Sequence, residues 1–176
     1  MKIKIGMTLV ILCAIAIHAC SGNSPAPPSQ NSAPPPTAVA GNAQNGQVVI
    51  TGAINKTYTP KELTAVKIGD RVGINVNESD VCGVSLQVPI DIQPGTYPIE
   101  DHLHSPVVNI FGEYDAPFCD DTPSELKHVF SSTQGTLTLT MTGKKFSGTF
   151  QFTAGNVKDE SKTIQVSGSF RDAALP

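Results

Sequence analysis

Five carboxylates lie close together around one cysteine in the second half of the chain. They occupy positions 113–125, and they are Glu113, Asp115, Asp120, Asp121 and Glu125, on either side of Cys119. Calcium takes about six to eight oxygen ligands, mostly from carboxylates and carbonyls, so an acidic loop of this kind can bind Ca²⁺. The spacing matches no EF-hand loop, and a solvated loop explains the same residues. We prefer the solvated loop and keep a calcium site at Glu113, Asp115, Asp120 and Asp121 as the alternative.

Two histidines, His102 and His104, stand two positions apart. On a strand both imidazoles would face the same way, and with an acidic neighbour they could chelate Zn²⁺ or Cu²⁺. The stretch lies between Pro98 and Pro106, where a polar connecting loop is expected. A bare His-x-His pair is a weak motif, so we prefer the loop and retain a metal site at these histidines as the alternative.

Cys82 and Cys119 are the only cysteines beyond residue 20. In an exported protein such an even pair predicts a disulfide, with two separate buried thiols as the alternative. A metal pair is disfavoured because neither cysteine has the Cys-x-x-Cys spacing of a zinc site.

Composition and motifs argue against two broad classes of function. The chain has 12 Lys and Arg against 15 Asp and Glu, a net charge of −3, which disfavours nucleic acid as a partner because phosphates are bound by clustered cations. Gly-x-Ser-x-Gly, His-Glu-x-x-His and P-loop runs are all lacking in the sequence. We therefore expect a protein that is not an enzyme and that needs no cofactor.

The first residues have the pattern of an export signal. Lys2 and Lys4 precede an almost purely apolar run at 5–17, which is too short to span a bilayer as a helix. The run ends in Ile17-His18-Ala19-Cys20, which resembles a bacterial lipobox except for the bulky His18. The resemblance implies acyl chains on Cys20, and several chains together give stable membrane anchoring. Ordinary secretory cleavage after 14–16 is the alternative.

The next segment predicts a spacer. Positions 21–46 carry no charge, and prolines are dense between Pro25 and Pro36. Such a segment cannot bury enough apolar surface to offset its ordering entropy. We expect residues 1–19 to be a signal peptide, 20–46 a lipidated cysteine with a Pro-rich disordered tether, and 47–176 a single β domain. Ser21 after the cysteine favours delivery to the outer membrane in lipoproteins that resemble this one.

The C-terminal end has the clearest structural pattern. Apolar residues alternate with Thr, Ser and Gln in 135–142, 145–153 and 162–170. A period of two predicts antiparallel strands with one apolar and one wet face. Gly143 and Lys144 are expected to form a hairpin turn, and 154–161 a longer loop.

Two glycines fall on the apolar face of these strands. Gly148 and Gly168 are predicted to mark bulges or close packing beneath a large neighbour such as Phe150 or Phe170.

Further strands are expected upstream, at 47–54, 71–76, 82–90, 95–99 and 107–111. Two segments have helix-start chemistry, Thr59-Pro60-Lys61-Glu62 and Thr122-Pro123-Ser124-Glu125, and each predicts a single helical turn. About eight short strands with two such turns indicate an all-β fold, a mostly antiparallel sandwich or flattened barrel.

The order of these features resembles a known family. An aromatic-Thr/Pro turn lies at 54–60, Gly95-Thr96-Tyr97 opens a strand, and Phe146-Ser147-Gly148-Thr149-Phe150 and Val166-Ser167-Gly168-Ser169-Phe170 follow. The series resembles small bacterial lipoproteins of unknown function, best known from Bacteroidetes-type outer membranes. The resemblance covers most of 47–170 and implies fold and location, since it consists of strand-packing residues.

From these observations we expect an envelope protein that is anchored to the membrane by its N-terminal lipid. Its β domain is expected to have a binding or structural role, with an unidentified protein or envelope component as the partner. The alternative function is a carrier for a metal ion or small ligand, using the acidic 113–125 segment or His102 and His104.

Overall fold

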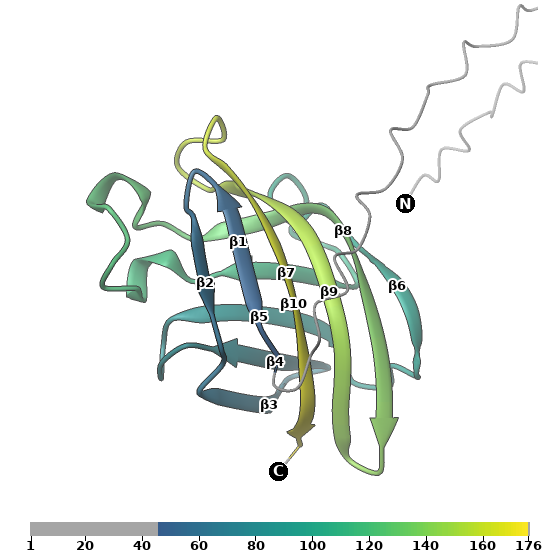
Figure 1. The fold of residues 1–176 in the computed structure, drawn as a ribbon. Coiled ribbons are helices and arrows are strands. Elements are labelled where there is room, and N and C mark those ends of the chain that lie inside the picture. The colour runs from purple at the N-terminus through teal and green to yellow at the C-terminus, as the bar shows by residue number, and fades with distance from the viewer. Residues whose placement is uncertain (1–45, 176) are drawn as a thin grey trace, which may run out of the picture. The chain divides into compact units, whose positions relative to one another are not determined.

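The computed structural model describes residues 46–175, which form ten β-strands and two short 3₁₀ turns (Figure 1). The strands are β1 (Val48–Gly52), β2 (Lys56–Tyr58), β3 (Glu62–Ile68), β4 (Arg71–Asn77), β5 (Gly83–Pro89), β6 (Gly95–Ile99), β7 (Phe111–Tyr114), β8 (Phe130–Thr142), β9 (Lys145–Asn156) and β10 (Thr163–Ala174). The 3₁₀ turns, η1 (Ala116–Phe118) and η2 (Ser124–Leu126), lie between β7 and β8.

All ten strands belong to one antiparallel sheet that curls into a half-barrel (Figure 1). Its order is β2-β1-β10-β9-β8-β7-β5-β4-β3, and β6 pairs with β8 beyond the end of β7. The all-β prediction is confirmed, with ten strands where about eight were expected. Strands β2 and β3, neighbours in the chain, form the two opposite edges of the sheet.

The three C-terminal strands are the longest and were the best predicted. Thr142 pairs with Lys145, which leaves Gly143 and Lys144 as a two-residue turn. Gly143 has φ 62°, the positive value that the first central residue of a type II′ hairpin turn requires. The predicted hairpin is therefore confirmed. The predicted loop at 154–161 was too long, since β9 continues to Asn156.

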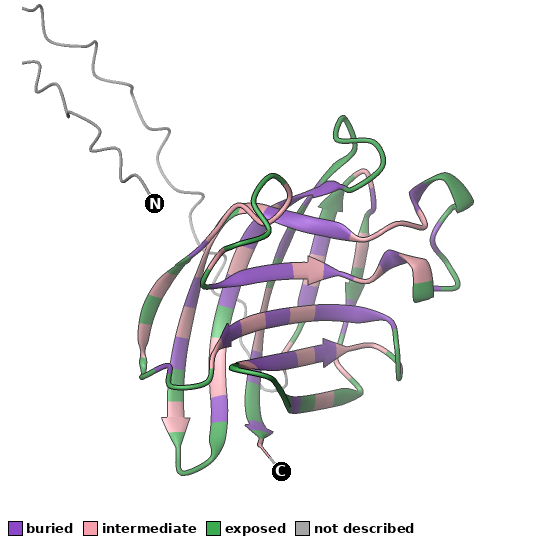
Figure 2. Cartoon of the chain, turned by 180° about the vertical axis from the view of Figure 1, so that it is seen from behind, coloured by how far each residue is buried: buried purple, intermediate pink, exposed green. Residues whose placement is uncertain are grey.

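One face of the sheet is apolar and forms the core, since buried positions alternate with half-buried ones along β5 and with exposed ones along the first half of β10 (Figure 2). No α-helix covers this face in residues 46–175, so the sheet covers itself by curling. The largest fully buried side chains include Tyr114, Phe130, Phe146 and Phe170.

Glycines make room for the aromatic rings of this core. Gly148 pairs with Phe170, and a Cβ at Gly148 would lie 3.1 Å from the Phe170 Cζ atom. Gly168 pairs with Phe150, and its Cβ would lie 2.6 Å from the Phe150 Cζ atom. The prediction of close packing beneath these rings is confirmed.

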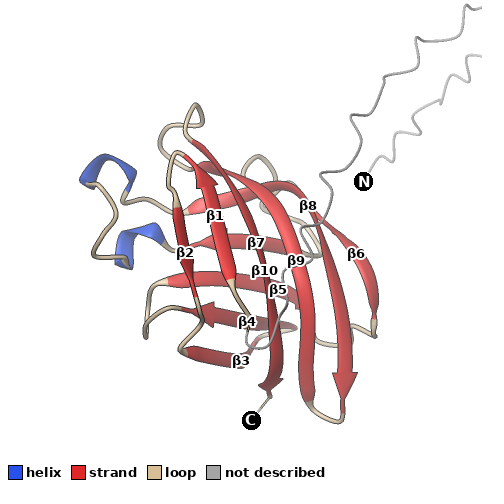
Figure 3. Ribbon diagram, viewed as in Figure 1, coloured by secondary structure: helices blue, strands red, loops and turns tan. Residues whose placement is uncertain are grey.

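Two predicted elements are corrected. The segment from Thr59 to Glu62 does not begin a helix, because Glu62–Ile68 forms the edge strand β3 and pairs along its whole length with β4. The strand expected at 107–111 begins only at Phe111 and runs to Tyr114. The second helical turn is present as η2, with Pro123 rather than Thr122 at its N-cap (Figure 3).

The predicted signal peptide, the lipid site at Cys20 and nearly all of the tether lie outside the described residues and stay predictions.

Substituting Gly148 with alanine is expected to destabilise the domain by about 1–3 kcal/mol. The added Cβ would lie 2.3 Å from the carbonyl oxygen of Thr138 on β8, so backbone would have to move. Chemical denaturation measures the difference. Thr149→Ala, at an exposed position on the same strand, is the control and should change stability by less than the glycine variant. Equal stability of the two variants would contradict the packing argument.

Candidate functional site

A disulfide fixes one end of the half-barrel. It joins Cys82, just before β5, to Cys119, just after η1, with the Cα atoms 4.9 Å apart, so the predicted pairing is confirmed. Both cysteines are buried, but Val81 and Phe118 beside them are more than half exposed. The bridge thus ties the segment containing both 3₁₀ turns to the sheet and holds two apolar side chains in solvent.

An ion-pair cluster lies at the same end. Lys56 Nζ lies 2.5 Å from Glu78 Oε2 and 2.8 Å from Asp121 Oδ1, although the Lys56 side chain is only 11% exposed. Burial by itself would lower the pKa of Lys56, but its hydrogen bonds to Asp121 and Glu78 outweigh that effect and raise the pKa. The same contact lowers the pKa of Asp121. Lys56 therefore carries its charge and links β2 to two loops.

Tyr58 and Asp115 complete this end. The Tyr58 hydroxyl donates to the carbonyl of Val76 (2.9 Å), which connects edge strand β2 to β4, and burial raises the pKa of Tyr58. The Asp115 amide donates to Gly83 O (2.9 Å) at the start of β5. Burial, and secondarily the charge of Glu113, raise the pKa of the Asp115 carboxyl to about 6.

The candidate calcium residues do not converge. Asp121 contacts Lys56, Asp115 is half-buried, Asp120 is exposed, and Glu113 accepts a hydrogen bond from Ser131 Oγ (3.1 Å). Within residues 46–175, His, Cys, Asp and Glu side chains form no group of three that could hold a metal ion.

The two histidines point to different partners, because the segment between β6 and β7 is a turn rather than a strand. The His102 ring stacks on Phe111 with the ring centroids 3.8 Å apart, and its Nε2 lies 3.7 Å from Glu113 Oε1. His104 Nδ1 lies 2.9 Å from Asp101 Oδ2, and its Nε2 lies 3.3 Å from Glu160 Oε2. Asp101 and Glu160 raise the pKa of His104. Each histidine thus holds the loop against its surroundings.

Arg71 also anchors this loop, a role the sequence did not reveal. Its guanidinium donates to the carbonyls of Val108 (3.1 Å) and Asn109 (2.5 Å), and its Cζ lies 5.1 Å from the centre of the Phe111 ring. Arginine suits this position because its planar fork can donate several hydrogen bonds while stacking on an aromatic face.

The face of β8–β10 that points away from the core is uncharged over most of its length. We call it the hydroxyl face, and it comprises Thr136, Thr138, Thr140, Ser147, Thr149, Gln151, Thr153, Gln165, Ser167 and Ser169, all exposed or half-buried. The register aligns them in rows across the strands, such as Thr138, Thr149 and Ser169. Thr138 Oγ1 also lies 3.1 Å from Thr96 Oγ1, which extends that row onto β6.

No family model matches the chain, and no curated protein matches it.

Residues 46–175 contain no helix that is long and apolar enough to cross a membrane.

Removing the disulfide with Cys82→Ala and Cys119→Ala is expected to lower the free energy of unfolding by about 3–4 kcal/mol. The bridge closes a loop over a sequence separation of 37, and such a crosslink restricts the unfolded chain by roughly that amount. Guanidinium denaturation with and without dithiothreitol provides the measurement. Reductant should destabilise the natural chain and leave the double variant unchanged. A natural chain that reductant does not affect would refute this expectation.

Asp115→Asn is expected to stabilise the domain by about 1–2 kcal/mol at pH 7.5, allowing for the partial exposure of the carboxyl. A folded-state pKa raised to about 6 means that the native carboxylate is disfavoured, so the natural chain loses stability as pH rises from about 4 to 6. The advantage of the variant should therefore disappear near pH 4. Unfolding curves across pH 4–8 test this, with Asp120→Asn as the exposed control. A pH-independent difference would contradict it.

Proposed function

We propose that this protein is a lipid-anchored component of the bacterial cell envelope, and that its β domain binds a ligand or another envelope component without catalysing a reaction. The observation that carries the proposal is the Cys82–Cys119 disulfide. Structural disulfides persist in oxidising compartments such as the periplasm and the cell surface. The bridge therefore supports the export that the N-terminal basic and apolar residues predict.

The polar clusters support a binding or structural domain. Lys56 joins β2 to two loops, Arg71 and His102 hold the segment between β6 and β7, and the disulfide holds the segment after η1. These groups are all engaged in positioning loops on the sheet. The hydroxyl face, in contrast, presents aligned hydrogen-bonding groups to solvent, which is the arrangement that a binding surface needs.

A metal or small-ligand carrier is the second candidate. Its support is the approach of His102 Nε2 to Glu113 Oε1, at 3.7 Å, which brings together one imidazole and one carboxylate from the predicted sets. Two such groups are fewer than the three protein ligands of a typical zinc site, so we rank this candidate below the first.

Cys20→Ala should move the protein from the membrane fraction to the soluble fraction, because the variant cannot carry the acyl chains that hold it to the bilayer. Fractionation of the expressing cells, followed by immunoblotting, measures the change. Cys13→Ala is the matched control, since loss of this cysteine, which lies within the apolar run, should leave membrane association intact. A Cys20→Ala protein that stays wholly in the membrane fraction would refute the lipid anchor.

A further inference from the structure

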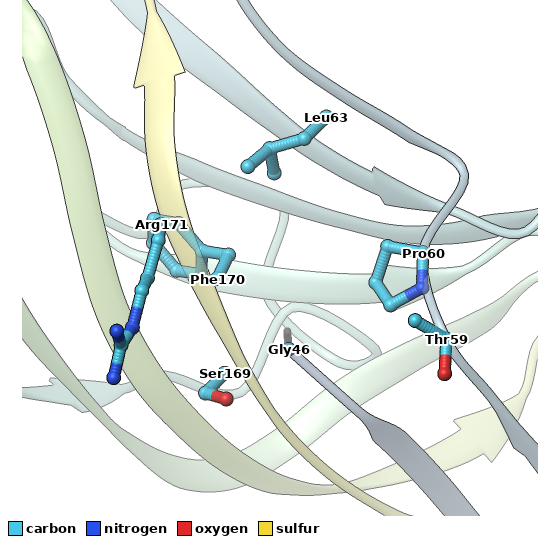
Figure 4. Close-up of a pocket in the computed structure, with 7 residues that line it drawn as sticks. All are labelled: Gly46, Thr59, Pro60, Leu63, Ser169, Phe170 and Arg171. Atoms are coloured by element: carbon cyan, nitrogen blue, oxygen red, sulfur yellow. The ribbon is translucent and has the colours of Figure 1, made fainter. Parts of the chain in front are cut away.

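A hollow in the hydroxyl face lies beside the end of β10. Its volume is about 250 Å³, and it is lined by Thr138, Thr140, Ser147, Gly148, Thr149, Ser169, Phe170 and Arg171. We call it the Arg171 hollow. A neighbouring hollow of about 330 Å³ shares Ser169–Arg171 and is completed by Gly46, Thr59, Pro60 and Leu63 (Figure 4). Figure 4 shows the Arg171 side chain directed away from Leu63 and Pro60.

The backbone beside Arg171 is irregular. The pairing of β10 with β9 shifts between Phe170 and Ala173, and Asp172 has φ 59°, the only positive φ of a non-glycine residue in 46–175. The Asp172 amide donates to Ser147 Oγ (3.0 Å), which fixes the bulge to β9. Bulges redirect side chains, and left-handed backbone at a non-glycine residue is an unfavourable conformation that often accompanies a functional site.

Arg171 is the one charged group that lines this hollow. Within the described residues its guanidinium has neither an ion pair nor a hydrogen-bond partner, although it carries five donors. The hydroxyls of Thr149 and Ser169 likewise have no partner among these residues, whereas Thr140 Oγ1 donates to Ser147 O (3.2 Å). The hollow thus combines one free cation with free hydroxyl groups.

We propose that the Arg171 hollow binds an acidic sugar unit, that is, a saccharide carrying one carboxylate or phosphate. Arginine pairs with either anion through two parallel hydrogen bonds, and serine and threonine hydroxyls both donate to and accept from sugar hydroxyls. A volume of about 250 Å³ is slightly below the range of small-molecule pockets, which suits a single sugar unit. Because the site is open to water, the expected dissociation constant is in the millimolar range.

This inference rests on the proposed binding role and names the ligand class for it. The proposed site differs from an ordinary polar sheet face, which would bind sugars only weakly and without distinguishing acidic from neutral ones.

The test is a titration of isotope-labelled full-length protein in detergent micelles, in which NMR records the amide chemical shifts at each ligand concentration. The probes are methyl galacturonide, galactose 6-phosphate, neutral methyl galactoside and inorganic phosphate. The two acidic sugars distinguish a carboxylate ligand from a phosphate ligand. We expect at least one of them to shift Ser147, Thr149 and Ser169, with an affinity at least fivefold above that of methyl galactoside and of inorganic phosphate.

Arg171→Gln should weaken binding of the acidic sugar by about five- to twentyfold and leave the response to methyl galactoside unchanged. Lys144→Gln, which removes an exposed charge from the hairpin outside the hollow, is the matched control and should leave both responses unchanged.

Equal affinity of the natural chain and Arg171→Gln, shifts confined to another surface, or equal binding of acidic and neutral sugars would overturn the proposal. Inorganic phosphate binding as tightly as the sugars would also overturn it, since the hollow would then recognise an anion alone. The titration works in detergent whether or not Cys20 is acylated, so its failure is distinct from failure of the lipid anchor in cell fractionation.

Discussion

The curl of the sheet depends on phenylalanine rings that lie over glycines on neighbouring strands. A β-sheet with one apolar face must cover that face, and in residues 46–175 it does so by bending, without an α-helix to pack against it. Bending brings bulky inward side chains together. Phe170 fits because its partner across the ladder is Gly148, and Phe150 fits because its partner is Gly168. The strand register that places each ring over its glycine also aligns the outer residues in the rows of the hydroxyl face.

The open end of the half-barrel needs a different kind of restraint. Strands β2 and β3 lie at opposite edges of the sheet, although only a short connection separates them in the chain. They are not paired with each other, so no backbone ladder closes the sheet between these edges. The Tyr58 hydroxyl, the Lys56 ammonium and the disulfide supply the missing contacts to β4, to the β4–β5 turn and to the segment after η1. The ion pairs of Lys56 and the disulfide reach loops, whose apolar side chains are too few to pack firmly, and the Tyr58 hydroxyl joins two strands that are not neighbours in the sheet.

The sequence predicted the parts of the fold whose pattern is local. Alternation identified β8, β9 and β10, Gly143 identified their hairpin, and the count of cysteines identified the disulfide. Thr59-Pro60-Lys61-Glu62 has the local chemistry of a helix start and yet enters β3, because all seven residues of that strand pair with β4. Here pairing with the next strand of a hairpin overrode the helix-start chemistry of four residues. The contacts of Lys56 with Asp121 and of Arg71 with the 108–109 carbonyls had no sequence signal, since they join residues 65 and 37–38 positions apart.

A residue that departs from its local conformational preference is therefore informative where neither strand pairing nor core packing explains the departure. Most of the domain obeys those rules: inward residues are apolar, outward residues are polar, and the hairpin turn has its glycine. The end of β10 does not, since Asp172 adopts left-handed backbone at a bulge and its neighbour Arg171 stays unpaired among the described residues. Arg71, the other arginine of the described residues, has two carbonyl partners, and Lys56 has two carboxylate partners. Natural sequences tend to keep such irregularities where function requires them, because selection for stability alone would remove them. The combination of an unpaired guanidinium, unpaired hydroxyl groups and an irregular backbone in one place is the physical reason to look for the ligand at this edge of β10.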